Sequence, residues 1–228
     1  MKTTQSTIKY TPRTEGFWEI PGVVYRGETG TYRLFEEMTP SMIQDQLAQV
    51  YTKEKQKGNP HPTDMPLVWA IVTQAYELRD EDQSKTLQQF LRGGLRIFPN
   101  TLTRIIYDTS GEDCIIHNYG TSDSYSIGGT IVGSGGLINE ITDPEILKEI
   151  IGTQDIKKIN EISQYVNGTD TYLWRLNSNG TDCYFFRLKP RPKDERVARF
   201  DADGDGLGLD CGRHPRVEGP AFRVLRVD

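Results

Sequence analysis

The segment VARFDADGDGLGLDC, residues 197–211, decides the fold prediction for this chain. Its centre, residues 203–206, reads Asp-Gly-Asp-Gly, which is typical of a tight turn between two antiparallel strands. Because side chains alternate between the two faces of a strand, the flanking residues divide into two sets. One set is apolar and suits a protein core: Phe200, Ala202, Leu207, Leu209 and Cys211. We therefore expect a β-hairpin with one buried face.

The opposite face of the predicted hairpin has a very different composition. Aspartate and glycine predominate there, at Asp201, Asp203, Gly208, Asp210 and Gly212. Clustered like charges repel one another, and glycine weakens a strand. The pattern predicts an outer face whose residues contribute little to folding and are free to serve another purpose.

Composition bounds the class of protein. The 228 residues are enough for one large domain or two small ones. The net charge of −5 comes from mixed signs along the chain, without the basic stripe of a nucleic-acid-binding protein. No apolar run approaches the length of a membrane span, so we expect neither nucleic acid nor a membrane as a partner.

Two further features concern the compartment. The segment 1–14 is polar and lacks the apolar centre of a signal peptide, so we expect a cytoplasmic or virion-associated location. The three cysteines, Cys114, Cys183 and Cys211, form no paired-ligand motif and are too few for a disulfide framework. Each is expected to be a small buried apolar residue.

Periodicity predicts strands and helices in separate stretches, an α+β arrangement. Short strands with glycine turns are expected in residues 1–40. Helices are expected from Ser41 to about Lys55, from Thr63 or Asp64 onward, from about Asp82 to Leu91 with a stop at Gly93–Gly94, and from Pro144 to Ile151. Strands are expected at 102–107, 115–117, 130–132, 172–176, 183–188 and 222–227.

Several motifs in the second half of the chain resemble one known family. They are Trp174-Arg175-Leu176, Lys189-Pro190, Glu195-Arg196-Val197-Ala198-Arg199-Phe200, Leu207, Leu209-Asp210-Cys211, Pro215 and Pro220-Ala221-Phe222-Arg223-Val224. This frame is similar to the C-terminal frame of variable proteins of diversity-generating retroelements. His117-Asn118-Tyr119-Gly120-Thr121 resembles an upstream region of archaeal and viral members. The resemblance covers roughly residues 100 to 228.

The resemblance implies a mode of action. In that family a reverse transcriptase copies a template repeat and mutates its adenines, and the copy replaces the variable repeat of the gene. The product keeps a C-type-lectin fold and displays the altered side chains on a rigid surface that binds ligands. For this chain it implies N-terminal strands and helices in 1–100, either separate from or integrated with a C-type-lectin-like part in 101–228. The variable region would lie at about 196–220.

The genetic code offers a check on that implication. An asparagine codon mutated at its two adenines cannot encode Glu, Gln, Lys, Met or Trp, so Glu218 is assigned to the fixed frame. The expected ligand-binding positions are all of permitted types: Asp201, Asp203, Asp205, Gly208, Asp210, Gly212, Arg213, His214, Arg216, Val217 and Gly219. We expect a non-enzymatic receptor-recognition protein without a cofactor, whose ligand is a protein or another surface macromolecule.

Calcium binding is an alternative interpretation of the acidic segment. Asp201, Asp203, Asp205 and Gly206 match the first ligand positions and the glycine of an EF-hand loop. Gly212, however, stands where that loop requires a bidentate glutamate. A shorter loop would use Asp201, Asp203, Asp205 and Asp210 in a calcium-binding protein with a structural or adhesion role. A third interpretation is an acidic turn without a function of its own.

Catalytic groups are not gathered in the sequence. His61, His117 and His214 are scattered, and Cys114 and His117 would point to opposite faces of one strand. These spacings favour neither a zinc site nor a nucleophile–base pair, and we expect no enzyme.

Overall fold

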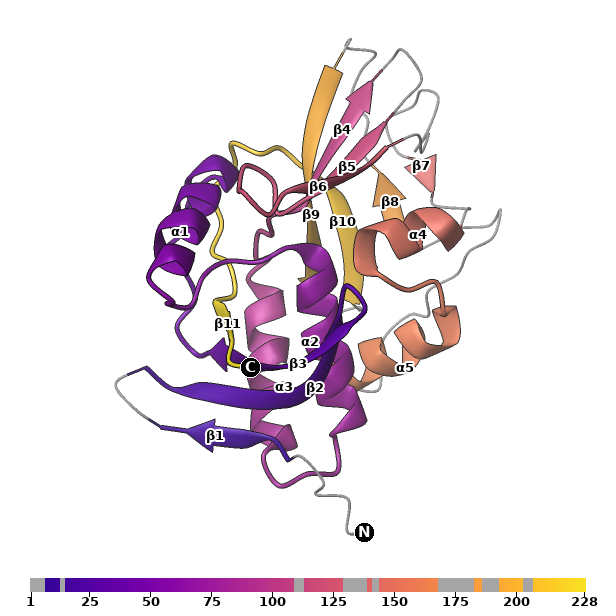
Figure 1. The fold of residues 1–228 in the computed structure, drawn as a ribbon. Helices are drawn as coiled ribbons and strands as arrows, with labels where there is room; N and C mark the ends of the chain where they lie inside the picture. The colour runs from indigo at the N-terminus through magenta and orange to yellow at the C-terminus, as the bar shows by residue number, and fades with distance from the viewer. Residues whose placement is uncertain are drawn as a thin grey trace.

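The computed structural model describes residues 7–12, 15–108, 113–128, 139–140, 144–167, 183–185, 193–202 and 207–228. Within these ranges the chain forms eleven strands in two sheets, together with five helices (Figure 1). The prediction of a mixed α and β fold is therefore confirmed. The strands predicted at 130–132 and 172–176 lie outside the described residues.

The smaller sheet joins the two ends of the chain. Its strand order is β1-β2-β3-β11, with all neighbours antiparallel. The strands are β1 (Lys9–Thr11), β2 (Phe17–Tyr25), β3 (Glu28–Phe35) and β11 (Val224–Arg226). Ile20, Val23 and Leu34 are almost fully buried, since one face of this sheet packs against the helices. The early strands and the final strand expected from the sequence are thus present.

The larger sheet contains the predicted hairpin near its centre. Its strand order is β6-β5-β4-β9-β10-β8-β7, and only the β10–β8 pair is parallel among the described strands. The strands are β4 (Arg104–Asp108), β5 (Cys114–His117), β6 (Tyr125–Gly128), β7 (Asn139–Glu140), β8 (Cys183–Phe185), β9 (Lys193–Ala202) and β10 (Leu207–Arg213). The hairpin of β9 and β10 is flanked on both sides, because β9 also pairs with β4 and β10 also pairs with β8.

The described helices are α1 (Gln44–Gln56), α2 (Met65–Glu77), α3 (Ser84–Arg96), α4 (Pro144–Ile151) and α5 (Ile156–Asn167). They follow the predicted order, but α1 begins at Gln44 after the N-cap Ile43, so the prediction of a start at Ser41 was wrong. Two further differences concern α3 and α5. The prediction that α3 stops at Gly93–Gly94 was wrong, because the helix continues to Arg96. Gly94 lies inside the helix, where its lack of a side chain lets Phe222 pack closely. A Cβ atom built there would lie 2.6 Å from the Phe222 ring.

The second difference is α5, which the sequence analysis did not predict. Asp155 caps this helix, since its Oδ1 accepts a hydrogen bond of 3.0 Å from the Lys158 amide. Ile159, Ile162 and Val166 are fully buried at helical spacing. The signal was therefore present in the sequence as an acidic cap followed by a helical apolar stripe.

Helix α2 is the central element of the core. Its N-cap is Asp64, whose Oδ1 accepts from the Leu67 amide at 3.0 Å, and Pro66 occupies the first turn. The helix is buried on most of its circumference, and one continuous apolar core includes residues from Ile8 to Val224. Both predicted parts of the chain, 1–100 and 101–228, contribute to this core. Among the described residues, no helix has the length and apolar character needed to cross a membrane.

Candidate ligand-binding surface

The β9–β10 hairpin is present, with the predicted buried face. Leu207 lies opposite Ala202, and Leu209 lies opposite Phe200. Phe200, Leu207, Leu209 and Cys211 are each at most 2% exposed. The Phe200 ring packs against Trp69 of α2 with 5.3 Å between ring centroids. The inner face is therefore fixed by the core of the protein.

The outer face contains an ion pair that the sequence analysis did not anticipate. Arg199 Nε donates to Asp210 Oδ2 at 2.7 Å, and the two residues lie directly opposite each other. The Gly212 amide donates to Asp210 Oδ1 at 2.7 Å. The expectation that the outer face contributes little to folding is thus wrong at Asp210, because both carboxylate oxygens hold parts of the hairpin together.

The segment after β10 is exposed at its tip and anchored at its base. His214, Arg216 and Val217 are exposed, whereas Pro215 is buried. The Pro215 carbonyl accepts from the Gln44 amide at 3.1 Å, at the start of α1. Asn100 Nδ2 donates to the Val217 carbonyl at 3.2 Å. Contacts to the loop backbone therefore position its base. Two side chains of the loop add local contacts, since the His214 Nδ1 accepts from the Arg216 amide at 3.2 Å and the Arg213 Nη2 donates to the Glu218 carbonyl at 2.6 Å.

Gly219 occupies a different environment from the other expected binding positions. It is buried, and its backbone exchanges two hydrogen bonds of 3.1 Å with Met42. A Cβ atom at this position would lie 3.0 Å from Asn100 Nδ2. We therefore place Gly219 with the supporting frame of the loop and leave it out of the exposed surface.

A segment that the sequence analysis did not single out borders the hairpin. Ile97 is 52% exposed, and Phe98 has a left-handed backbone with φ +55°. The Arg199 guanidinium lies over the Phe98 ring at 5.0 Å. No local motif connects residues 97–98 with the hairpin, so only the tertiary structure could reveal this neighbour.

We define the recognition face as the exposed and half-buried residues of these three segments. Its described members are Ile97, Phe98, Gly208, Asp210, Gly212, Arg213, His214, Arg216 and Val217. Arg199, which pairs with Asp210, is buried, and the exposed Glu218 was assigned to the fixed frame. Asp201 lies in β9 opposite Gly208, but its side chain is outside the described part. Asp203 and Asp205 also lie outside the described residues.

The described residues contain no cluster of side chains that supports the calcium alternative. Among the described residues, no group of three His, Cys, Asp or Glu side chains is arranged to hold a metal ion. Of the four proposed ligands, only the Asp210 side chain is described, and both of its oxygens are already hydrogen-bonded. The side chains of the other three, Asp201, Asp203 and Asp205, lie outside the described part.

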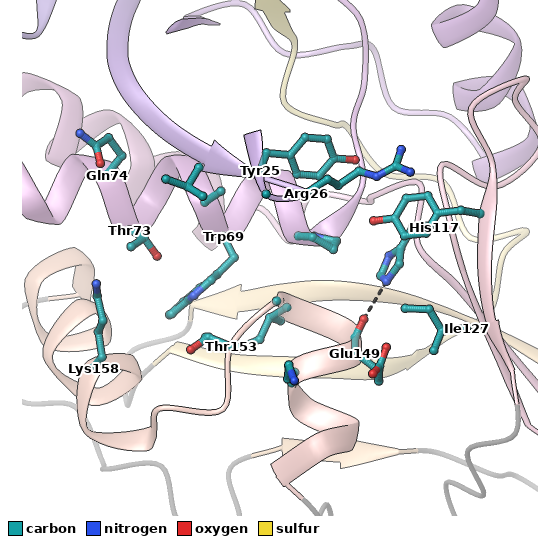
Figure 2. A pocket seen from close by; sticks show the side chains of 18 of the residues that line it. Tyr25, Arg26, Trp69, Thr73, Gln74, His117, Ile127, Glu149, Thr153 and Lys158 are labelled. Atoms are coloured by element: carbon teal, nitrogen blue, oxygen red, sulfur yellow. Dashed lines mark hydrogen bonds between the residues drawn. The ribbon is translucent and has the colours of Figure 1, made fainter. Parts of the chain in front are cut away.

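A cavity elsewhere in the protein shares no lining residue with the recognition face, and Figure 2 shows side chains that line this cavity. Its volume is about 600 Å³, and it lies between the β2–β3 turn, α2, the β5–β6 pair and α4. His117 borders it, where its Nε2 donates to the Glu149 carbonyl at 2.7 Å and its Nδ1 lies 2.8 Å from Thr103 Oγ1. Burial lowers the His117 pKa below its ordinary value. This histidine therefore connects β5 to α4 in its neutral form.

A buried carboxyl group connects the two sheets beside this cavity. Asp64 Oδ2 accepts from Tyr25 Oη of β2 at 2.6 Å and from Tyr125 Oη of β6 at 3.4 Å. Burial raises the Asp64 pKa. The other histidines have separate partners: His61 packs against the Tyr51 ring, and His214 is exposed. The structure thus does not gather the histidines into one site.

Comparison of the chain with known protein families finds no family that matches, and comparison with curated proteins and with solved structures finds no match either. The function therefore has to be inferred from the residues and their arrangement.

Proposed function

We propose that the protein is a diversified ligand-binding protein with a C-type-lectin-like scaffold, which recognises a protein or another surface macromolecule through the recognition face. The observation that carries the proposal is the division of one hairpin into two faces. The inner residues are at most 2% exposed, whereas Gly208, Asp210 and Gly212 on the same strand are half-buried. One strand thus combines a fixed side with a side that can change.

Anchoring of the loop supports the same proposal. The backbone at residues 215, 217 and 219 is held by Gln44, Asn100 and Met42. These three contacts do not involve the side chains of His214, Arg216 or Val217, so they persist when those side chains are replaced. Because such a surface is ordered before the ligand arrives, it loses little conformational entropy on binding.

The apolar residues of the recognition face provide anchor points for a macromolecular ligand. Ile97 and Val217 are 52% and 43% exposed, although large apolar side chains are usually buried. Arg213 and Arg216 precede Val217 in the sequence and add positive charge. An apolar centre with a polar rim is the common composition of protein-binding surfaces.

Two matched libraries test the proposal. In the first, the codons for Gly208, Gly212, Arg213, His214, Arg216 and Val217 are replaced by codons derived from asparagine through adenine mutation. In the second, Phe200, Leu207, Leu209 and Cys211 receive the same set of codons. Both libraries are displayed on cells, and folded members are counted by their resistance to protease.

We expect most members of the first library to stay folded, because a change at a solvent-facing position alters stability by about 0.5 kcal/mol or less. Most members of the second library should be cleaved, since truncation in a core costs roughly 2–5 kcal/mol. The first library should also yield binders to an arbitrary protein such as streptavidin. Equal loss of folded members in both libraries would contradict the proposal.

A further inference from the structure

The large cavity of Figure 2 has the size and walls of a small-molecule site. Its volume of about 600 Å³ falls within the range of roughly 300–1,000 Å³ for ligand pockets. The apolar part of its wall comes from β2, α2, β6 and α4 and consists of Val24, Pro66, Trp69, Ala70, Ile127 and Ile151. None of these residues belongs to the recognition face.

Trp69 has an unused hydrogen-bond donor at this cavity. The residue is only 4% exposed and packs against Phe200, yet its indole N–H forms no hydrogen bond with any described residue. Trp18, in contrast, donates from its Nε1 to Thr86 Oγ1 at 3.3 Å. The indole nitrogen keeps some solvent access although most of the residue is buried, so this donor is open to the cavity. An acceptor atom on a molecule in the cavity would receive its hydrogen bond, and Figure 2 shows Trp69 reaching from α2 toward the α4 side.

Positive charge predominates around the same cavity. The lysine, arginine and glutamate residues of its lining are three bases, Arg26, Lys148 and Lys158, and two acids, Glu77 and Glu149. Glu77 is already paired with Lys158 at 2.8 Å. Arg26 forms no ion pair with any described residue, and its guanidinium lies over the Tyr125 ring at 4.1 Å. A carboxylate or similar anion would therefore find an available cation at the cavity.

The backbone at Arg26 is that of a tight hairpin turn. Arg26 and Gly27 have φ values of +53° and +78°, and they connect the paired residues Tyr25 and Glu28. Positive φ at both central residues is usual for a two-residue hairpin turn. The turn between β2 and β3 thereby places Arg26 at the lining of the cavity.

We propose that this cavity is a second binding site, separate from the recognition face, for a small organic anion with an apolar ring. The ring occupies the apolar wall beside Ala70 and Ile127. An acceptor atom of the ligand receives the Trp69 N–H, and its negative charge faces Arg26. Because all of these residues lie outside 196–220, the site stays constant while the recognition face changes.

Titration calorimetry with 2-naphthoate tests the proposal on the full chain. The isosteric cation 2-naphthylmethylammonium serves as a charge control. We expect 2-naphthoate to bind and the ammonium compound to bind at least about tenfold more weakly, since the charge-assisted contact with Arg26 is lost.

Three variants locate the binding. Arg26→Gln should weaken 2-naphthoate binding by about tenfold, and Trp69→Phe, which keeps the packing on Phe200, by about fivefold. Ala70→Trp should abolish binding by filling the cavity, with Thr73→Phe as a second filling variant if Ala70→Trp does not fold. The matched control is Arg92→Gln, since Arg92 is exposed on α3 and does not line the cavity.

Three results would overturn the proposal. They are absence of 2-naphthoate binding at millimolar concentration, equal binding of the ammonium compound, and unchanged binding in the folded cavity-filling variants. The folded state of each variant is checked by its thermal unfolding midpoint. None of these results bears on the recognition face, which this site does not share.

Discussion

Arg199 and Asp210 face each other across β9 and β10, with 2.7 Å between Nε and Oδ2. The same guanidinium lies over the Phe98 ring. Arg199 therefore links the hairpin to the segment that follows α3. This ion pair therefore helps to hold β9 and β10 together on the same face of the hairpin as the exposed residues.

Replacement of Asp210 tests the structural role of this pair. Asp210→Ser should lower the free energy of unfolding by about 1–3 kcal/mol, because Arg199 would be left largely buried without its carboxylate. Arg216→Ser, on the exposed loop, should change it by no more than about 0.5 kcal/mol. Denaturant unfolding of both variants measures the difference. Equal effects would mean that Asp210 contributes nothing beyond an ordinary surface residue.

Replacement of Gly219 tests its assignment to the frame of the loop. Gly219→Ala should destabilise the protein by about 1–3 kcal/mol, because the added methyl group would press against the Asn100 amide. Gly212→Ala provides the matched control, since Gly212 is half-buried and lies on the recognition face. Thermal unfolding compares the two. If Gly219→Ala is as stable as the control, Gly219 returns to the candidate binding positions.

The pH dependence of stability tests the neutral state of His117. Burial lowers its pKa in the folded protein below the ordinary value of 6.5, so the unfolded chain binds the proton more tightly. The stabilising contribution is present above pH 6.5 and is lost as the pH falls through the lowered folded pKa. Stability should therefore decline from about pH 7 to about pH 5.

His117→Gln should reduce that decline, while a glutamine can still donate to the Glu149 carbonyl and accept from Thr103. His61, whose pKa burial also lowers, continues to contribute in the variant. His214→Gln is the control on the exposed loop. Denaturant unfolding at several pH values gives the slopes. An identical slope in wild type and His117→Gln would show that His117 does not titrate as described.

Calcium titration separates the recognition proposal from the calcium alternative. We expect millimolar calcium to leave the thermal unfolding midpoint unchanged, because Asp210 is engaged with Arg199 and the Gly212 amide. An ion that binds only the folded state would raise the midpoint. A rise that Asp205→Ala abolishes would favour the acidic loop as a calcium site.

Much of the local structure could be predicted because it depends on short-range signals. The alternation around residues 203–206 gave the hairpin and its buried face. Apolar stripes gave the approximate place of α1, α2 and α4, and the Asp64 cap gave the start of α2. The pairing of Arg199 with Asp210 depends on the strand register, which the alternation alone does not fix.

Other features depend on contacts between distant segments. Helix α3 continues through Gly94, and the missing side chain there leaves room for the ring of the distant residue Phe222. The place of Ile97 and Phe98 beside the hairpin, and the burial of Gly219 against Asn100, likewise arise only when the chain is folded. The cavity beside Trp69 joins residues from β2 to α5, so no local pattern could indicate it.

The origin of the recognition face is the central claim, and the DNA that encodes the chain tests it most directly. Sequencing the gene and its downstream flank would show whether a near-copy of the codons for Arg196 to Pro220 lies beside a reverse-transcriptase gene. We predict such a copy, with mismatches at its adenines in codons for outward residues such as Asp201, Gly208 and Arg213. The codons for Leu207, Leu209 and Gly219 should match. Absence of a copy, or mismatches spread equally over buried and exposed positions, would contradict the claim.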